Sequence, residues 1–137
     1  MADIATAVRA VLTAASVDST ATGGIFPDVL PQGCTYPAIR YALTTDISFG
    51  HLSGKSSFAE AIINIDCYAL TRLAATSLAD LVKIALDRYS GTVSGINIAR
   101  AYVGVGTHAF REPADKSDLG VYRANRDYRI FYVENIS

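Results

Sequence analysis

The sequence predicts a single α+β domain in which an antiparallel sheet of about four strands carries two helices on one face. Three observations predict this fold. Two segments repeat apolar residues at helical spacing, and four segments are rich in strand-forming or alternating residues. Their order is helix, strand, strand, helix, strand, strand (α-β-β-α-β-β), and 137 residues without a dividing linker fit one domain, residues 1–137.

The first helix is predicted near the start of the chain. Apolar residues recur at i, i+4, i+7, i+8 and i+11 from Ile4, which predicts one amphipathic helix over residues 3–16. Residues 17–37 then contain three of the four prolines and three glycines. This segment is predicted to be irregular, apart from a short extended piece at Ile25 and Phe26.

Two neighbouring strands are predicted next. Side chains alternate between apolar and polar over residues 38–47 and again over residues 58–70. Between them, residues 48–57 contain two glycines and four serines, which predicts a long hairpin loop. The faces expected to point into the core carry Ile39, Tyr41, Leu43, Ala61, Ile63, Ile65, Cys67 and Ala69.

The clearest helix follows the second strand. Thr71 or Thr76 is expected to cap its N-terminus through the side-chain oxygen, and Gly91 is expected at its C-cap. The predicted apolar stripe of this helix consists of Ala74, Leu78, Leu81, Val82, Ala85 and Tyr89.

Two further strands complete the predicted sheet. Strand-forming residues dominate residues 96–105 and 120–133, and a long charged loop is predicted between them at 106–119. Because both helices are expected on one side, the other face of the sheet is expected to be uncovered. In the last strand, side chains are expected to alternate between the two faces of the sheet. One face carries Tyr122, Tyr128, Ile130 and Tyr132, and the other carries Arg123, Asp127, Arg129 and Phe131.

Composition excludes some classes of function. The chain has 12 basic and 13 acidic residues with no run of either sign, which argues against tight binding to nucleic acid or to a membrane surface. Hydrophobic residues make up 50% and the mean hydropathy is +0.25, so some apolar surface is expected to contact another subunit. The first residues lack the basic leader of a signal peptide, and no stretch predicts a membrane span, so we expect cytoplasmic synthesis and reduced cysteines.

The residue types that carry catalysis or bind metals are scattered. Cys34, His51, Cys67 and His108 have no paired ligand spacing, and Cys34 lies in a turn without a neighbouring base to activate it. Residues 104–109 match the G-x-G-x-x-A pattern of a dinucleotide-binding turn, but the segment after them interrupts the required helix. We therefore predict no enzyme activity, no cofactor and no metal site.

Arginine and tyrosine are interleaved near the end of the chain. Arg123, Arg126 and Arg129 stand among tyrosines, a combination found on stacking surfaces for single-stranded nucleic acid and also at protein interfaces. Asp127 and Glu134 dilute the positive charge, so we favour a protein interface.

Short motifs follow one another in a characteristic order between and after the two predicted helices. In that order and spacing the chain resembles the tail terminator, or tail completion, family of long-tailed phages (siphoviruses) and gene transfer agents. The motifs are Ile25-Phe26-Pro27, Pro31-Gln32-Gly33, Tyr36-Pro37-Ala38-Ile39-Arg40-Tyr41, Ile65-Asp66-Cys67-Tyr68-Ala69 and Tyr128-Arg129-Ile130-Phe131-Tyr132.

The resemblance implies a structural virion protein without catalysis. Such a subunit forms a homo-hexameric ring that caps the finished tail tube and offers the surface for head-tail joining. The implied partners are the tail tube protein and a head-tail connector or stopper protein, with DNA only passing through the lumen. The implied location is the head-proximal end of the virion tail, after synthesis in the host cytoplasm.

Residues for these contacts are predicted from the pattern of faces and loops. The partly polar sheet face and the sheet edges are expected to form the subunit interface, and the two long loops to reach the tube, the lumen or the connector. The expected interface residues are Arg40, Asp66, Tyr68, Arg123 and Arg129. The expected loop contacts are Phe49, His51, Leu52, Lys55, Arg111, Asp115 and Lys116.

Two alternatives remain open at the level of sequence. A head-tail connector or stopper ring of the same particle has the same general requirements for a small ring-forming subunit. A small dimeric ligand-binding α+β domain would need a pocket with converging polar groups, which the sequence does not assemble.

Overall fold

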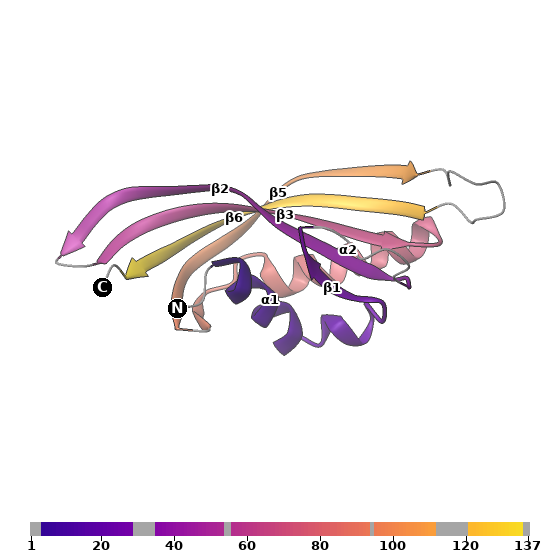
Figure 1. Cartoon of the computed structure of the whole chain (residues 1–137), viewed down its shortest axis with the longest axis horizontal. Coiled ribbons are helices and arrows are strands. Elements are labelled where there is room, and N and C mark those ends of the chain that lie inside the picture. The colour runs from indigo at the N-terminus through magenta and orange to yellow at the C-terminus, as the bar shows by residue number, and fades with distance from the viewer. Residues whose placement is uncertain (1–3, 29–34, 54–55, 94, 112–120, 136–137) are drawn as a thin grey trace.

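The computed structural model describes residues 4–28, 35–53, 56–93, 95–111 and 121–135. It confirms the α+β class, with a six-stranded mixed sheet where about four antiparallel strands were predicted (Figure 1). The sheet order is β1-β2-β3-β6-β5-β4. Among the strand pairs of the described residues, β1 with β2 is parallel and the others are antiparallel. The elements are α1 (Ile4–Ala14), a 3-10 turn η1 (Val17–Ser19), β1 (Gly24–Pro27), β2 (Ala38–Ser53), β3 (Ser56–Ala69), α2 (Arg72–Leu86), β4 (Gly91–Val93), β5 (Ile96–Arg111) and β6 (Val121–Asn135).

Both helices lie on one side of the sheet, as predicted (Figure 1). Helix α2 begins where expected, because the Thr71 side-chain oxygen accepts a hydrogen bond from the Ala74 backbone nitrogen at 3.1 Å. Its buried residues differ partly from the predicted stripe, since Leu81 is 38% exposed. The buried residues of α2 are Ala75, Leu78, Ala79, Val82 and Leu86. The buried face of the helix is therefore rotated slightly from the predicted stripe. None of the helices in the described residues is both long and apolar enough to cross a membrane.

The predicted C-cap of α2 is wrong. The C-cap residue is Asp87, whose backbone nitrogen donates to the Lys83 oxygen, and the left-handed residue just after it is Arg88, with φ 64°. Gly91 instead begins β4 with φ 151°. A left-handed conformation is open to a non-glycine residue when the surrounding backbone holds it, so glycine alone did not mark the end of the helix.

The predicted hairpin loop at 48–57 is also wrong. Strand β2 continues to Ser53 and β3 begins at Ser56, so their backbones pair through most of this segment. Register shifts in β2, including one between Ser48 and Gly50, accommodate the glycine within the ladder. Serine and glycine weaken a strand but do not prevent one when a neighbouring strand supplies backbone partners.

Strand β5 is also longer than predicted, because β6 supplies backbone partners along it. It runs to Arg111, so residues 106–111 of the loop predicted at 106–119 are strand. The first glycine of the dinucleotide-like pattern, Gly104, lies in a register shift of this strand, and the second, Gly106, ends that shift. A Cβ at Gly104 would lie 3.0 Å from the Asp127 oxygen of β6, so the close approach of the two strands favours glycine there.

The short extended piece predicted at Ile25 and Phe26 is strand β1, which pairs with the first residues of β2. A close backbone approach holds it in place. The Gly23 nitrogen donates to the Pro37 oxygen at 2.7 Å, and a Cβ on Gly23 would lie 1.8 Å from the Thr35 oxygen. Only glycine fits this position, because any side chain would collide with the backbone before β2.

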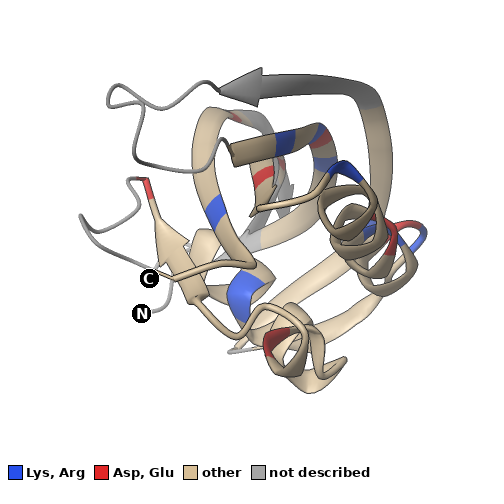
Figure 2. Cartoon of the chain, turned by 90° about the vertical axis from the view of Figure 1, so that its right-hand side faces the viewer, with Lys and Arg blue, Asp and Glu red and all other residues tan. Residues whose placement is uncertain are grey.

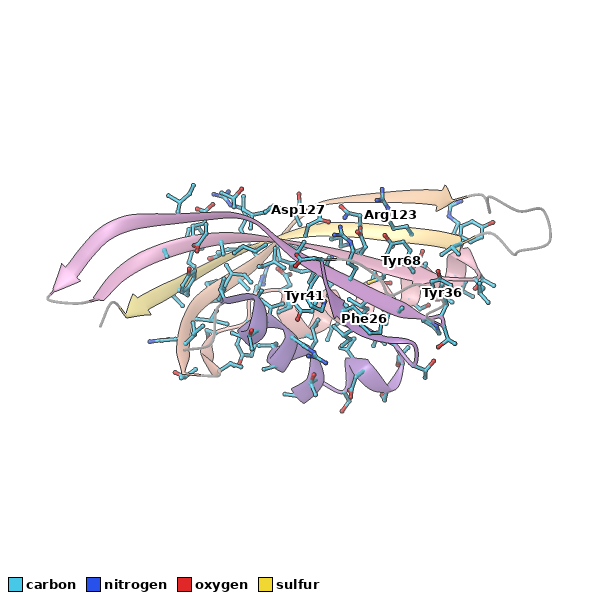
Figure 3. The ribbon with its side chains drawn as sticks, viewed as in Figure 1. Phe26, Tyr36, Tyr41, Tyr68, Arg123 and Asp127 are labelled. Carbon is cyan, nitrogen blue, oxygen red and sulfur yellow. The ribbon has the colours of Figure 1, made fainter. Side chains whose placement is uncertain are left out.

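The central strands separate their two faces as predicted. The helix side carries the buried apolar residues of β2, β3 and β6, although Leu43 is 39% exposed. In Figure 3, Tyr41 lies on the helix side, whereas Arg123 and Asp127 lie on the opposite side. That opposite side is called the polar face below. It carries Arg40, Glu60, Asn64, Asp66, Tyr68, Arg100, Tyr102, Arg123, Asn125, Asp127, Arg129 and Phe131.

Candidate interaction surface

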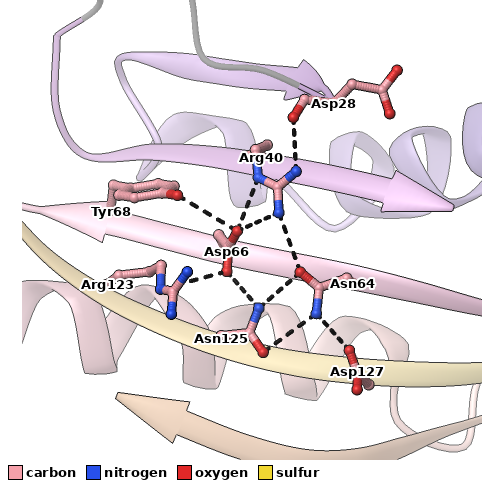
Figure 4. A network of polar contacts seen from close by, with 8 residues as sticks. All are labelled: Asp28, Arg40, Asn64, Asp66, Tyr68, Arg123, Asn125 and Asp127. Atoms are coloured by element: carbon pink, nitrogen blue, oxygen red, sulfur yellow. Dashed lines mark hydrogen bonds and ion pairs between the residues drawn. The ribbon is translucent and has the colours of Figure 1, made fainter. Parts of the chain in front are cut away.

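Asp66 of β3 is the centre of a hydrogen-bonded network on the polar face (Figure 4). The residue is 0% exposed. Its Oδ2 accepts hydrogen bonds from Nε and Nη2 of Arg40 at 2.9 and 2.6 Å, and its Oδ1 accepts one from Nδ2 of Asn125 at 2.5 Å. A buried carboxylate requires such partners, so the three central strands together make this charge tolerable.

Arg40 connects this network to the edge of the sheet. Its Nη1 donates to the backbone oxygen of Asp28 at 2.7 Å, just after β1, and its Nη2 also contacts Oδ1 of Asn64 at 3.3 Å. Partial burial opposes the charge of the guanidinium, but the hydrogen bond and charge of Asp66 outweigh it and raise the pKa of Arg40. The guanidinium therefore stays charged and held in one orientation.

Two amides extend the network across β3 and β6. Nδ2 of Asn125 donates to Oδ1 of Asn64 at 2.8 Å, and Nδ2 of Asn64 donates to Oδ1 of Asp127 at 2.5 Å. Together the two amides join Asp66, which is bound by Arg40, to Asp127. The chain of bonds fixes four side chains on two strands.

Tyr68 and Arg123 form the more open border of the network. The Tyr68 hydroxyl donates to Oδ2 of Asp66 at 3.5 Å, a long contact. Nε of Arg123 lies 3.9 Å from Oδ1 of Asp66, and the Arg123 side chain is 40% exposed. Because this pair is long and solvated, Arg123 keeps much of its capacity to bind another group.

A second cluster lies farther along the polar face. Nη2 of Arg129 contacts both carboxylate oxygens of Glu60, at 3.0 and 3.1 Å. The Arg129 guanidinium also lies 5.8 Å from the ring centre of Phe131, whose ring meets that of Tyr102 edge-on at 6.2 Å. Arg129 and Tyr102 are largely exposed, at 56% of the side chain and 47% of the residue.

Arg126 does not belong to the polar face. Its side chain lies on the helix side, where Nη1 donates to the Ala79 oxygen of α2 at 3.2 Å and Nη2 pairs with Asp80 at 3.3 Å. The interleaved arginines at 123, 126 and 129 are therefore divided between two sides of the sheet. This division argues against a continuous stacking surface for single-stranded nucleic acid.

The charges on the described part of the polar face are nearly balanced. Its four arginines include Arg100, which lies opposite Phe131, and they share the face with three carboxylates. Each of the two buried acids is paired within the subunit. Figure 2 shows basic and acidic residues interspersed on the curled sheet. Such a face can recognise another protein surface by shape, hydrogen bonds and aromatic contact, with little net attraction for a polyanion.

Of the cysteines and histidines considered from the sequence, only Cys67 has a described side chain. Burial, reinforced by the charge of Asp66, raises the pKa of Cys67 to about 12, so this thiol is protonated and unreactive near neutral pH. No group of three metal-ligating side chains occurs among the residues described. Cys34 lies outside them, and only the backbone is described for His51 and His108.

The structure joins four of the five predicted interface residues, Arg40, Asp66, Tyr68 and Arg123, in one network, and places Arg129 in the second cluster. Sequence reasoning missed Asn125 and did not assign Glu60, Asn64 or Asp127 to the site. Their shared face was readable from the alternation, but their contacts depend on register between strands. Of the predicted loop contacts, Lys55, Asp115 and Lys116 lie outside the described residues, and Phe49, His51, Leu52 and Arg111 are described by their backbone alone.

The fold is shared with a component of a solved virion. One chain in the structure of the virion of a native gene transfer agent (GTA) particle matches this chain with a TM-score of 0.65 and 17% sequence identity. The match covers 94% of this chain and 93% of that chain. No protein-family model matches the sequence, and no curated protein matches it. At this identity the likeness shows a common fold.

Proposed function

We propose that this chain is a structural virion protein of the tail terminator type. It forms a homo-hexameric ring that caps the tail tube and provides the surface for head-tail joining. The observation that carries the proposal is the common fold, over almost the whole length of both chains, with a component of a gene transfer agent virion. The order of short motifs in the sequence supports the same assignment by a separate route.

The polar face is proposed as part of the subunit interface, with different roles for its residues. Asp66 and Arg40 are mostly buried, so their role is to hold neighbouring side chains in place. Arg123 and Arg129 are 40% and 56% exposed and reach outward, so they contact the next subunit, with Tyr68 beside the first of them. Prearranged side chains lose little conformational entropy on association, which favours a defined contact.

The long β2-β3 hairpin is proposed to contact the tube, the lumen or the connector. Its strands extend past both helices, at the left of Figure 1. The proposed contacts there are Phe49, His51, Leu52 and Lys55, and at the other end of the sheet Arg111, Asp115 and Lys116. A formal net charge of -1 suits a ring through which DNA only passes, because it avoids tight binding to phosphate.

The experiment that tests the function is native mass spectrometry of the purified chain, alone and mixed with tail tube protein. A closed hexamer in either sample, bound to the tube protein in the second, supports a terminator. A hexamer that binds portal complexes and ignores the tube protein supports a head-tail connector or stopper instead. A monomer or dimer in both samples would reject the ring.

A matched pair of variants tests the proposed contact residues. Arg123→Ala combined with Arg129→Ala removes two exposed guanidinium groups of the polar face and should weaken ring assembly. Arg9→Ala is the control, because Arg9 is an exposed arginine on α1, away from this face. Equal hexamer fractions in both variants would exclude the polar face from the interface.

A further inference from the structure

The short strand β1 covers only the beginning of its neighbour. It pairs with Ala38 to Tyr41 of β2, and the Asp28 nitrogen then donates to the Tyr41 oxygen at 2.8 Å. Asp28 has φ 63°, a left-handed conformation that ends the strand. Among the pairings of the described residues, positions 42–53 of β2 are bonded only to β3. The outer edge of β2 is thus open over most of its length.

The opposite edge of the sheet repeats this arrangement. Strand β4 pairs with the first residues of β5, and Ala101 exchanges backbone hydrogen bonds with Arg88 and Tyr89 at 2.6 and 3.0 Å. The Val103 nitrogen then donates to Oδ1 of Asp87 at 3.1 Å. Beyond this point, residues 104–111 of β5 pair only with β6 among the described residues.

Long open edges expose unpaired backbone groups and are normally shielded by charges, by proline or by a covering element. In the described side chains of the open β2 segment, at 42–47, the only charged residue is Asp46. Its Oδ1 already accepts a hydrogen bond from the Tyr132 hydroxyl at 2.8 Å. Leu43 and Ile47 are instead 39% and 45% exposed. Exposed apolar residues on an unshielded edge strand are typical of an edge that pairs with a strand of another chain.

The directions of the two edge strands allow them to pair with one another between copies. Each of β2, β3, β6 and β5 is antiparallel to the next, so β2 and β5 run in opposite directions. If a second copy continues the sheet, its β2 lies antiparallel to β5 of the first copy. The alternation of the sheet and the division into polar and helix sides are both preserved.

The positions of the open segments require neighbouring copies to be staggered along the strand direction. The open part of β2 lies at one end of the sheet and the open part of β5 at the other, left and right in Figure 1. Neighbouring copies must therefore be displaced along the strands when these segments meet. Tilted, staggered strands are the geometry that closes a curled sheet on itself. A contact between two different edges forms a ring when the rotation from copy to copy closes.

We propose that residues 42–53 of one subunit pair as an antiparallel strand with residues 104–111 of the next copy of this chain. This inference rests on the proposed ring and specifies how its subunits join. The occupant of each open edge is a second copy, since the chain itself supplies two open segments of opposite direction at complementary ends of one sheet.

Disulfide cross-linking tests this pairing. In a Cys34→Ser and Cys67→Ala background, Ile47→Cys is combined in turn with Thr107→Cys, His108→Cys and Ala109→Cys, and circular dichroism checks the fold. Because cross-linked cysteines need closely placed Cβ atoms, the three positions together sample the register. We expect at least one combination to give covalent oligomers up to the hexamer, which reductant dissociates.

Single variants and a distant pair provide the controls. Ile47→Cys alone should give no cross-linked dimer, because a contact between different edges does not place it beside its own copy. Ile47→Cys with Ser77→Cys should also give none, as Ser77 is exposed on α2. A cross-linked dimer from Ile47→Cys alone would show a symmetric edge contact, and a cross-link to tube protein would show a different occupant. Either result overturns the proposal.

Hydrogen exchange gives an independent measurement on the unmodified chain. Backbone amides of 42–53 and 104–111 should exchange roughly tenfold or more slowly in the ring than in the separated subunit. A hexamer by mass spectrometry without cross-links and without this protection would reject the edge pairing and leave the proposed function standing. The absence of any ring, alone or with tube protein, would reject both.

Discussion

Arg40 and Asp66 face each other directly across β2 and β3, with Nη2 of the guanidinium 2.6 Å from Oδ2 of the carboxylate. The Asp66 side chain is 1% exposed and that of Arg40 is 25% exposed. The pair therefore joins a fully buried acid to a partly solvated base that also contacts the segment after β1. It links stability of the subunit to the arrangement of the polar face.

Removing the arginine should destabilise the subunit strongly. Arg40→Ala leaves the buried carboxylate of Asp66 without its main partner, so we expect the free energy of unfolding to fall by about 3 kcal/mol. Urea denaturation at one fixed protomer concentration measures it. Arg123→Ala serves as the matched control, with an expected loss below about 1 kcal/mol because its contact with Asp66 is long and exposed.

The double variant identifies the cause of that loss. Arg40→Ala with Asp66→Ala removes both charges, so it should cost clearly less than the sum of the two single variants. Additive losses would show that the two side chains act independently, in conflict with the observed pair.

Burial of the Cys67 thiol should make stability depend on pH in the alkaline range. Its pKa is raised from 9.0 to about 12 by burial and by the charge of Asp66. The folded chain keeps the proton where the unfolded chain has lost it, so this contribution is complete below pH 9 and is lost as pH rises toward 12. The expected slope is at most about 1.4 kcal/mol per pH unit.

Cys67→Ala isolates this effect. Unfolding should be measured between pH 9 and 10, because burial also raises the pKa of Tyr128, which adds a second loss above its ordinary value of 10.0. The variant should lose less stability across this window than the unmodified chain. Identical slopes for the two proteins would contradict a raised thiol pKa.

The cap of α2 should contribute measurably to stability. Thr71→Ala removes the acceptor of the Ala74 nitrogen and should lower the free energy of unfolding by about 1 kcal/mol. Thr71→Ser keeps the hydroxyl and should retain most of it. Thr76→Ala tests the other capping residue considered from the sequence and should have almost no effect, since Thr76 lies inside the helix. Thermal denaturation of the three variants makes the comparison.

The hydrogen bond between Tyr132 and Asp46 should anchor the start of the long hairpin. Tyr132→Phe removes the donor and should cost about 1 kcal/mol. Asp46→Asn keeps an acceptor oxygen and should have a smaller effect. Hydrogen exchange of β2 beyond residue 46 reports the result, and unchanged rates in Tyr132→Phe would show that the strand pairing alone holds the hairpin.

The types of the main elements could be predicted because their signals are local. The apolar spacing from Ile4 and the alternation around Ile63 reflect the helical and strand periods, which packing preserves. The ends of the strands were harder to predict from the sequence. Ser48 and Gly50 disfavour strands by themselves, but β3 supplies their backbone partners. The extended piece at Ile25 and Phe26 was predicted, but its pairing with β2 was not, because so short a strand has no periodic signal.

By itself, the sequence determined the α+β class, the order of the main elements and the two faces of each central strand, including the side that carries Arg40, Asp66 and Arg129. Only the tertiary structure decided which of these side chains meet. Asn125 reaches Asp66 because the register of β3 against β6 places them opposite each other. Arg129 lies opposite Ile62 in the same register and reaches Glu60 along the diagonal. Register and open edges depend on pairing between segments distant in the chain, which a local pattern of residues does not specify.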